Sequence, residues 1–351
     1  MMFLNYIKPL AYNSQRFNYY ISVDFESMYI IISIYKSHLY FMINFLLLLV
    51  FLSCENTVSE PEKPDYFIAD YDVNNLPVSD LFEDYQAMGP LSNPAIDEAS
   101  GIAVCRQNSG FIWTHNDSGD MNRIFLIQNS GTWIGTFRLV GAGNRDWEDM
   151  AIGPGPIEGK NYLYIGEIGD NLGRYPIKYI YRLPEPDIDL ADSTVQWVDV
   201  ANVDRIPFVY PDSIMMDAET LLVDPWTKDI YIITKREFPV TVYKLPYPQS
   251  TVDTTVAIKY GTLPFTTATA GDISADGREI LVKTYEKVFL WSREEGESIA
   301  DAFMRQPLRV SYTPEMQGEA IAFPEDRSGY YTLSESRGGV TPVVYFYKRK
   351  E

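Results

Sequence analysis

Residues 113–120, WTHNDSGD, bring together several side-chain types that catalysis uses. His115 stands three positions before Ser118, and Asp117 and Asp120 lie on either side of that serine. Serine hydrolases need a histidine base that a third group orients, and this chain has no GxSxG elbow to present a nucleophile. Asn-Asp-Ser-Gly is also common turn composition. His115 is therefore a candidate general base, with a polar loop residue as the simpler interpretation.

A second group of reactive types consists of acids that recur where short apolar segments begin. These segments are SGIAV (100–104), EDMAI (148–152), ETLLV (219–223), GDISA (271–275) and GEAIAF (318–323). Recurring carboxylates could ligate a hard cation, because Ca²⁺ takes about six to eight oxygen ligands. They could instead serve as a general acid and base whose pKa values are separated by crowding. A purely structural role, accepting backbone N–H bonds, is the third interpretation.

These interpretations lead to two sets of acidic candidates. The candidate catalytic carboxylates are Glu148 and Glu219. The candidate ligands for a divalent cation, for which we expect Ca²⁺, are Glu98, Asp149, Asp272 and Glu319. Asp146 and Asp217 stand at the same segment starts and receive no role of their own.

Polar residues also end the apolar segment that comes next in each repeat. If the two segments are antiparallel neighbours, these ends lie on the same face as the acids. The candidate ligand-binding residues there are Asn116, Asp117, Asp170, Asn171, Lys235, Arg236, Lys283, Tyr285 and Glu335. The basic members would suit an anionic ligand, such as a phosphate ester held beside a metal ion. Local ion pairing with the acids is the alternative.

The elements that must position these residues are short strands in a repeated unit. IYRLPEP (180–186) matches VYKLPYP (242–248), and each follows two apolar segments at similar intervals. A fourth strand is expected at TWIGTFRLV (132–140), VQWVDVANV (195–203), TVAIKYG (255–261) and PLRVSYT (307–313). The pattern predicts an all-β fold, a single β-propeller of four-stranded blades, with five blades favoured over six. The last unit lacks a fourth strand, which residues 82–92 could supply to close the ring.

The N-terminal part reads as a targeting segment rather than as part of this fold. Residues 43–53, INFLLLLVFLS, are too few for a membrane span of about 20 residues and suit a signal peptide. FLSC (51–54) resembles the lipobox of bacterial lipoproteins, which implies a lipid on Cys54. An ordinary signal peptide or an anchor helix is the alternative. We expect a leader over 1–53, with translation starting later than Met1. A lipidated and acidic flexible tether is expected over 54–80, and the propeller over 81–351, in an exported protein held at the cell envelope.

Composition excludes several classes of function. The net charge is −19, which opposes binding to nucleic acid. Cys105 is the one cysteine besides Cys54, and His115 is the one histidine after the leader, so a His/Cys zinc site is excluded. We expect a monomer that takes a small molecule, a glycan or a phosphate compound at its acidic face.

Four segments resemble those of exported bacterial propellers of the phytase-like, esterase-like and strictosidine-synthase-like groups. They are WTHNDSGD (113–120), DWEDMAIGPG (146–155), YIGEIGDN (164–171) and DAETLLVDP (217–225). Likeness to the phytase-like group implies Ca²⁺ in the funnel and hydrolysis of phosphomonoesters. The positions with counterparts are Glu148, Glu219, Asp272, Glu319, Lys235 and Arg236. A non-catalytic propeller that binds a ligand or protein, and a glycoside hydrolase with funnel carboxylates, are the alternatives.

Overall fold

A computed structural model describes residues 33–44, 64–188 and 197–351 in two units, Met1–Lys63 and Pro64–Glu351. In the first unit, residues 33–44 form a helix. Among the described residues, no helix combines the length and apolar character needed to cross a membrane. The predicted lipidation site, Cys54, lies outside the described residues.

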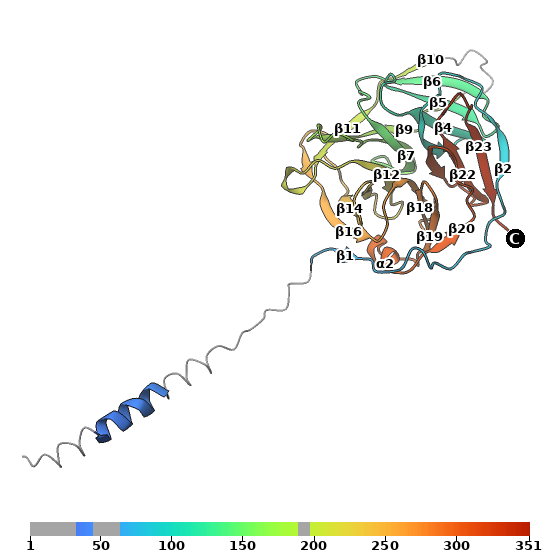
Figure 1. Ribbon diagram of the computed structural model, residues 1–351. Helices are drawn as coiled ribbons and strands as arrows, with labels where there is room; N and C mark the ends of the chain where they lie inside the picture. The colour runs from blue at the N-terminus through green and yellow to red at the C-terminus, as the bar shows by residue number, and fades with distance from the viewer. Residues whose placement is uncertain (1–32, 45–63, 189–196) are drawn as a thin grey trace, which may run out of the picture. The chain divides into compact units, whose positions relative to one another are not determined.

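The second unit folds into five small sheets that follow one another around a common centre (Figure 1). Blade one contains β3 (Ala99–Val104), β4 (Phe111–Asn116), β5 (Arg123–Gln128) and β6 (Trp133–Leu139). Blade two contains β7 (Trp147–Pro154), β8 (Asn161–Glu167), β9 (Lys178–Pro184) and β11 (Asp204–Val209). Blade three contains β12 (Ala218–Val223), β13 (Ile230–Thr234), β14 (Val240–Leu245) and β16 (Ile258–Leu263).

The last two blades complete the ring. Blade four contains β17 (Ala268–Ile273), β18 (Glu279–Thr284), β19 (Val288–Ser292) and β20 (Leu308–Val310). Blade five contains β21 (Gly318–Ala322), β22 (Gly329–Ser334), β23 (Val343–Lys348) and β2 (Gln86–Pro90). β2 pairs antiparallel with β23, so the first and last parts of the domain share one sheet. Both the five-bladed propeller and its closure by an N-terminal strand are confirmed.

Three further strands extend the outer edges of the first three blades in parallel. They are β10 (Trp197–Val200) on β6, β15 (Thr255–Val256) on β11, and β1 (Phe67–Ile68) on β16. The predicted fourth strand of blade two, VQWVDVANV, is therefore wrong, because β10 belongs to blade one and β11 takes its place. TVAIKYG likewise divides between β15 and β16. Apolar periodicity identifies a strand but does not indicate which sheet edge it joins.

The folded domain begins earlier than the sequence boundary at residue 81. Phe67, within the expected tether, is buried and packs against Tyr260 and Phe303. Gly261 makes this possible, because a Cβ there would overlap the Phe67 ring. The tether interpretation therefore fails for residues 64–80. Their acidic composition masked the short apolar run YFIA (66–69) that covers the edge of blade three.

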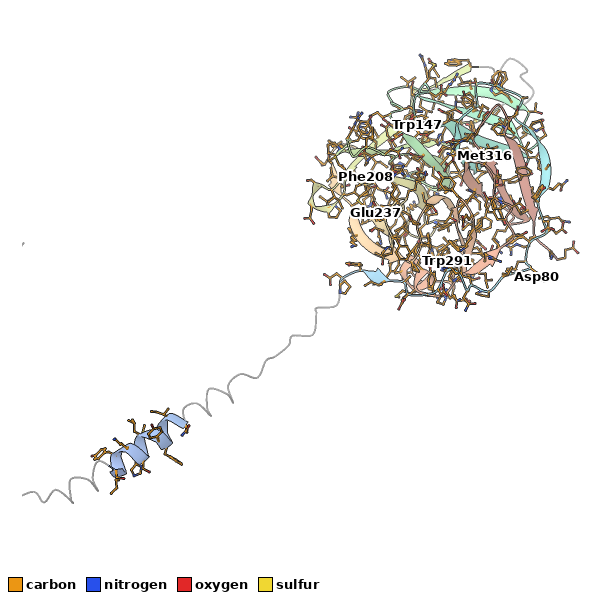
Figure 2. All side chains as sticks on the ribbon, viewed as in Figure 1. Asp80, Trp147, Phe208, Glu237, Trp291 and Met316 are labelled. Carbon is orange, nitrogen blue, oxygen red and sulfur yellow. The ribbon has the colours of Figure 1, made fainter. Side chains whose placement is uncertain are left out.

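The core lies between neighbouring blades. Trp147 of blade two, labelled in Figure 2, packs with Trp113 and Phe137 of blade one in a single buried cluster. Trp291 and Phe208, labelled in the same view, belong to other such clusters. A short helix, α2 (Ile299–Met304), precedes β20, and a 3₁₀ turn (Pro211–Ser213) precedes blade three. This packing fixes the five inner strands, whose starts carry the candidate site.

Candidate functional site

Each inner strand begins with a β-bulge that takes one or two residues out of the pairing with the second strand. The register shifts lie between Ala99 and Gly101, Trp147 and Met150, Ala218 and Thr220, Ala268 and Ala270, and Gly318 and Ala320. A bulge re-aims the side chain of the residue that it releases. The released residues are Ser100, Glu148 with Asp149, Glu219, Thr269 and Glu319. Three glutamates thus occupy equivalent bulges in blades two, three and five.

The register places two predicted metal ligands, Glu98 and Asp272, away from the bulges. The counterparts of Glu219 in blades one and four are Ser100 and Thr269, not Glu98 and Asp272. Glu98 is exposed and precedes β3. The residues around the bulge in ATAGDI are small. The segment therefore offers no large apolar side chain by which its register could be aligned with those of the other blades.

Asp149 and Asp272 have structural roles and do not line the pocket described below. The Asp149 carboxylate accepts backbone N–H bonds from Leu221 and Gly271, each 3.0 Å long. The Asp272 carboxylate accepts from Phe323 at 2.8 Å. Each carboxylate ties its own inner strand to a neighbouring one. Their position outside the pocket and their backbone partners favour a structural role, and their metal ligation stays a prediction.

The residues that follow the second strands meet the bulge residues at one pocket of about 420 Å³, which we call the funnel pocket. Asp117, Lys235, Tyr285 and Glu335 each come directly after β4, β13, β18 or β22. In blade two the same position holds the buried, apolar Ile168. The funnel pocket is lined by Asp117, Glu148, Asn171, Glu219, Lys235, Arg236, Thr266, Thr267, Tyr285, Gln317, Glu319 and Glu335. Nine of the predicted site residues are in this set.

One side of the funnel pocket is electrostatically compensated. Lys235 donates to Glu219, and Tyr285 donates to Glu319 at 2.8 Å. Arg236 donates to Asp217 at 2.5 Å. Burial alone would lower the pKa of Lys235, but Glu219 and Glu319 outweigh it and hold this pKa above its usual range. Lys235 and Arg236 are therefore cationic and already paired with acids.

Another group of carboxylates lacks such partners; Asp117 and Glu148 line the pocket, and Asp146 lies next to them outside its lining. One oxygen from each of Asp117, Asp146 and Glu148 lies within 4.8 Å of the other two. None of the three pairs with a basic side chain in the part of the chain that the structure describes. A second group, Glu148 with Asp217 and Glu219, meets the same criterion but includes the two paired acids. Glu148 is common to both groups.

Crowding and burial raise the pKa of the acids in this group. Burial, assisted by neighbouring carboxylates, raises the pKa of Asp117 to about 7. Burial and the charge of Asp217 raise the pKa of Asp146 to about 6, against the opposing effect of Lys178. Burial and Glu219 raise the pKa of Glu148 well above its usual range. In this environment the protonated or cation-bound form of each acid is therefore favoured over the free carboxylate.

Gly169 lets the two acids of blade two come together. A Cβ at this position would overlap Oε1 of Glu148 and lie 2.7 Å from Oδ2 of Asp146. The Gly169 N–H also donates to the Asp146 backbone carbonyl at 3.3 Å. The GEIGDN motif (166–171) thus supplies the space that the carboxylates occupy.

His115 is not placed to act as the predicted base. Its ring is fully buried and lies edge-on to Trp147, with ring centroids 5.4 Å apart. Nδ1 lies 3.0 Å from the Asn116 carbonyl oxygen, and burial lowers the pKa of His115 to about 4. The residue packs between blades one and two, outside the funnel pocket. The loop composition suggested exposure, whereas the alternation along β4 turns His115 inward.

Three predicted ligand-binding residues make hydrogen bonds or ion pairs within the fold and do not face the pocket. The Asn116 amide donates to the Ala95 carbonyl at 2.7 Å. Asp170 accepts from the Arg174 and Tyr175 backbones and pairs with Lys178 at 3.0 Å. Lys283 is fully buried and donates to the Gly318 carbonyl. None of the three lines the funnel pocket.

Asp146 and Asp217 are the acids to which the sequence interpretation gave no role. Each stands two positions before a bulge glutamate, in DWE (146–148) and DAE (217–219), and Gln317 has the same position in QGE (317–319). The backbone carbonyls of Asp217 and Gln317 accept from the Lys235 and Glu335 N–H groups at 3.0 Å. A repeated acid-x-Glu pattern was the signal that could have found them.

Comparisons with known proteins assign no family to this chain. No protein-family model matches the chain. No curated protein matches it either. A solved gluconolactonase from Xanthomonas campestris is 10% identical with a TM-score of 0.42, over 83% of this chain and 97% of its own. The Pan2 WD40 domain from Neurospora crassa is 10% identical with a TM-score of 0.40, over 78% of this chain and 98% of its own. Likeness at this level says nothing of the site, and the strand pairings themselves establish the propeller.

Proposed function

We propose that the funnel pocket binds a divalent cation, Ca²⁺, through Asp117, Asp146 and Glu148. The proximity of these three unpaired carboxylates carries the proposal. Hard cations prefer carboxylate oxygens, and a bound cation offsets the cost of crowding buried acids. The group formed by Glu148, Asp217 and Glu219 is the weaker candidate, because Lys235 and Arg236 already neutralise it.

The ligand that fits beside such a cation is a small anionic compound, and we propose a phosphate ester. Lys235 and Arg236 line the same pocket, so their positive charge faces a ligand that the cation also attracts. Burial and the charge of Glu319 raise the pKa of Glu335 to about 7. An acid with such a pKa can accept or donate a proton near neutral pH. The proposed activity is therefore metal-dependent hydrolysis of a phosphate ester.

The deciding experiment joins binding to turnover. The purified protein is assayed with Ca²⁺ on panels of phosphate esters and glycosides, beside Glu148→Gln and Glu219→Gln variants. We expect phosphate-ester hydrolysis that EDTA abolishes and that Glu148→Gln reduces by about 100-fold or more. Turnover on glycosides, insensitive to EDTA, would replace this proposal with a glycosidase. Calcium binding without turnover on either panel would favour a non-catalytic binding propeller.

We also propose that the protein is exported and lipidated on Cys54, within a lipobox-like FLSC sequence. Mass spectrometry of the N-terminal peptide after expression in a bacterium tests this directly. The expected product begins at a diacylglyceryl-modified Cys54, and Cys54→Ser should leave the leader uncleaved. A mature chain that begins at another residue, without lipid, would contradict the proposal.

A further inference from the structure

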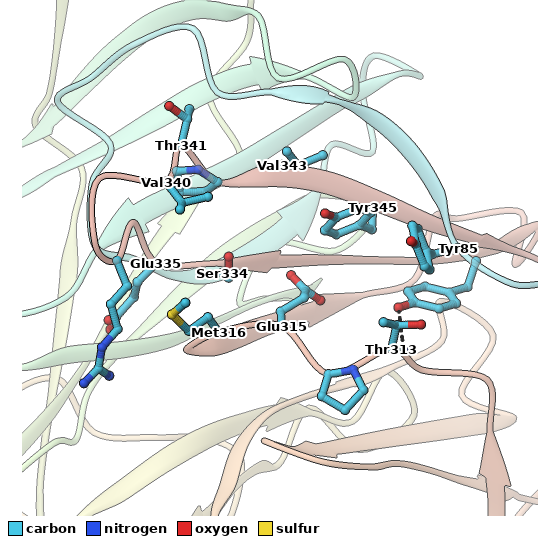
Figure 3. Close-up of a pocket in the computed structure, with 14 residues that line it drawn as sticks. Tyr85, Thr313, Glu315, Met316, Ser334, Glu335, Val340, Thr341, Val343 and Tyr345 are labelled. Atoms are coloured by element: carbon cyan, nitrogen blue, oxygen red, sulfur yellow. Dashed lines mark hydrogen bonds between the residues drawn. The ribbon is translucent and has the colours of Figure 1, made fainter.

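A second pocket, of about 250 Å³, lies beside the funnel pocket on blade five (Figure 3). Glu335 lines both pockets. The walls come from the segment before β21, from β23, and from the turn that joins β22 to β23. We call it the tyrosine pocket, and its lining includes Tyr85, Glu315, Met316, Ser334, Tyr345 and Tyr347.

Glu315 contributes a carboxylate oxygen that is left without a partner. Oε1 accepts from the Thr332 hydroxyl at 2.5 Å, whereas Oε2 is buried and accepts no hydrogen bond from any described residue. In Figure 3 this carboxylate points toward Ser334 and Tyr345. Burial raises the pKa of Glu315 to about 7 even though Lys283 opposes the shift. The Lys283 ammonium group is engaged elsewhere, since it donates to the Gly318 carbonyl.

Tyrosine rings form one wall of the pocket. Tyr85 and Tyr345 meet edge to face with centroids 5.1 Å apart, and Tyr85 lies 6.4 Å from Tyr347. Tyr85 is exposed, so the ring cluster is open to solvent on one side. The faces of such rings attract cations.

The charges that line the pocket favour a positively charged ligand. Glu315 and Glu335 are acidic, and Arg337 is the one basic residue among the described lining residues. Arg337 is exposed and belongs to the turn that bridges to Val340. A polyol hydroxyl could donate a hydrogen bond to Glu315 Oε2, but only a cation would also offset the negative charge of the carboxylate.

We propose that the tyrosine pocket binds a small organic cation carrying an ammonium group, with Glu315 as its counter-charge and the tyrosine rings around it. This site is separate from the proposed metal site and needs no metal in the funnel pocket. Because Glu335 borders both pockets, a ligand in one changes the charge seen by the other.

The test measures binding to the full chain, in non-ionic detergent with EDTA, by calorimetry. The probes are choline, methylammonium, and 3,3-dimethyl-1-butanol, which has the shape of choline without its charge. We expect one molecule of choline or methylammonium to bind per chain, and the neutral alcohol to bind at least about tenfold more weakly. EDTA keeps this outcome independent of any metal in the funnel pocket.

Two variants and one control locate the site. Glu315→Gln keeps the shape of the side chain and should weaken binding of the cation by about tenfold or more. Tyr85→Leu alters an exposed ring and should weaken it several-fold without unfolding the blade. Glu325→Gln, in the turn at the other end of β21, should bind as the unaltered chain does. Equal affinity for choline and the neutral alcohol, an unchanged affinity in Glu315→Gln, or no binding of either cation would overturn the proposal.

Discussion

Glu148 is the residue on which the acidic side of the funnel pocket depends. It belongs to both carboxylate groups, and Gly169 gives its carboxylate the space it occupies. Burial and Glu219 both disfavour its charged form. An acid held this way destabilises the fold unless a proton or a cation accompanies it, because a buried and uncompensated charge is costly. In the proposed site, Glu148 therefore lowers the stability of the metal-free protein and supplies a ligand to the cation.

Glu148→Gln separates these two effects. Removing the charge while keeping the shape should raise the unfolding temperature of the metal-free protein by about 2–4 °C for each kcal/mol of relieved repulsion. Ca²⁺ should raise the midpoint of the unaltered chain by mass action and have no effect on the variant. Thermal unfolding followed by circular dichroism, with and without Ca²⁺, measures both.

Glu98→Gln is the matched control, because Glu98 is exposed and lies outside the pocket. It should keep the full response to Ca²⁺. A calcium-induced rise that survives in Glu148→Gln, or its absence from the unaltered chain, would contradict the assignment.

At the scale of the element, the bulge at the start of each inner strand decides which side chains reach the pocket. The sequence predicts that Glu148, Glu219 and Glu319 occupy equivalent positions, and the register confirms this. The same alignment is wrong for Asp272, because the bulge in blade four lies at Thr269. A bulge is a backbone feature, and moving the alignment of GDISA by two residues keeps each side chain on the same face of the strand. The metal-binding and catalytic roles themselves stay predictions.

The residues that follow the second strand of each blade were easier to predict as pocket residues than the direction of side chains within the strands. Asp117, Lys235, Tyr285 and Glu335 all reach the pocket, because strand pairing places the residue directly after each second strand there. Blade two is the exception, since the apolar Ile168 packs into the core at this position. His115 does not, because packing against Trp147 decides its environment, and that contact joins two blades. Contacts between distant segments are not visible in local residue patterns.

Gly169→Ala tests the element that brings Glu148 and Asp146 together. The added methyl group would overlap one carboxylate and crowd the other, so both must move. We expect the affinity for Ca²⁺ to fall by about tenfold or more while the propeller stays folded. Calorimetric titration gives the affinity and circular dichroism the fold. Gly143→Ala, where an added Cβ would make only an ordinary contact with the Tyr181 hydroxyl at 3.8 Å, is the control for a general effect of replacing glycine. Unchanged affinity in Gly169→Ala would place the cation elsewhere.

Asp149→Ala tests the structural role assigned to that carboxylate. The change leaves the buried N–H groups of Leu221 and Gly271 without their acceptor. The free energy of unfolding should fall by on the order of 3 kcal/mol. Urea denaturation measures it, with Asp117→Ala as the comparison. Asp117 sits among other acids, so its removal should have no cost or should stabilise the metal-free protein. The two variants behaving alike would contradict the distinction between them.

At the scale of the whole molecule, the stability of the metal-free protein should fall as the pH rises from about 4 to about 7. Asp117 and Glu335, with a pKa of about 7, and Asp146, with a pKa of about 6, hold protons in the folded state that the unfolded chain has already released. Their contribution is complete below about pH 4, the usual range of these groups, and is lost through pH 6–7. Paired acids such as Asp170, whose pKa is lowered, stabilise the protein above their usual pKa, and this contribution is lost only when the pH falls below it.

Unfolding temperatures at pH 5 and pH 8 in EDTA test this sign, and Ca²⁺ should restore stability more at pH 8 than at pH 5. Asp117→Asn should flatten the profile, because one of the titrating groups is gone. A midpoint that climbs steadily between these pH values in EDTA would show that the crowded acids do not govern this range.

The ring and its closure could be predicted because they follow from a repeat, and a repeat is a property of the whole chain. The strands that cover the outer edges could not, because β1, β10 and β15 join blades other than the ones that their sequence neighbours complete. β1 pairs with β16, almost two hundred residues later in the chain. Such pairings depend on the finished ring and leave little trace in local composition.

Blade five is built from the two ends of the domain, and this sets the order of events during synthesis. β2 is made before the other strands of the ring but has no strand partner until β23 is made. The ring can therefore close only after β23, the last strand of the ring, has been made. A chain that stops before Val343 keeps two open sheet edges, which invite proteolysis and aggregation. Closure thus discriminates between finished and unfinished molecules.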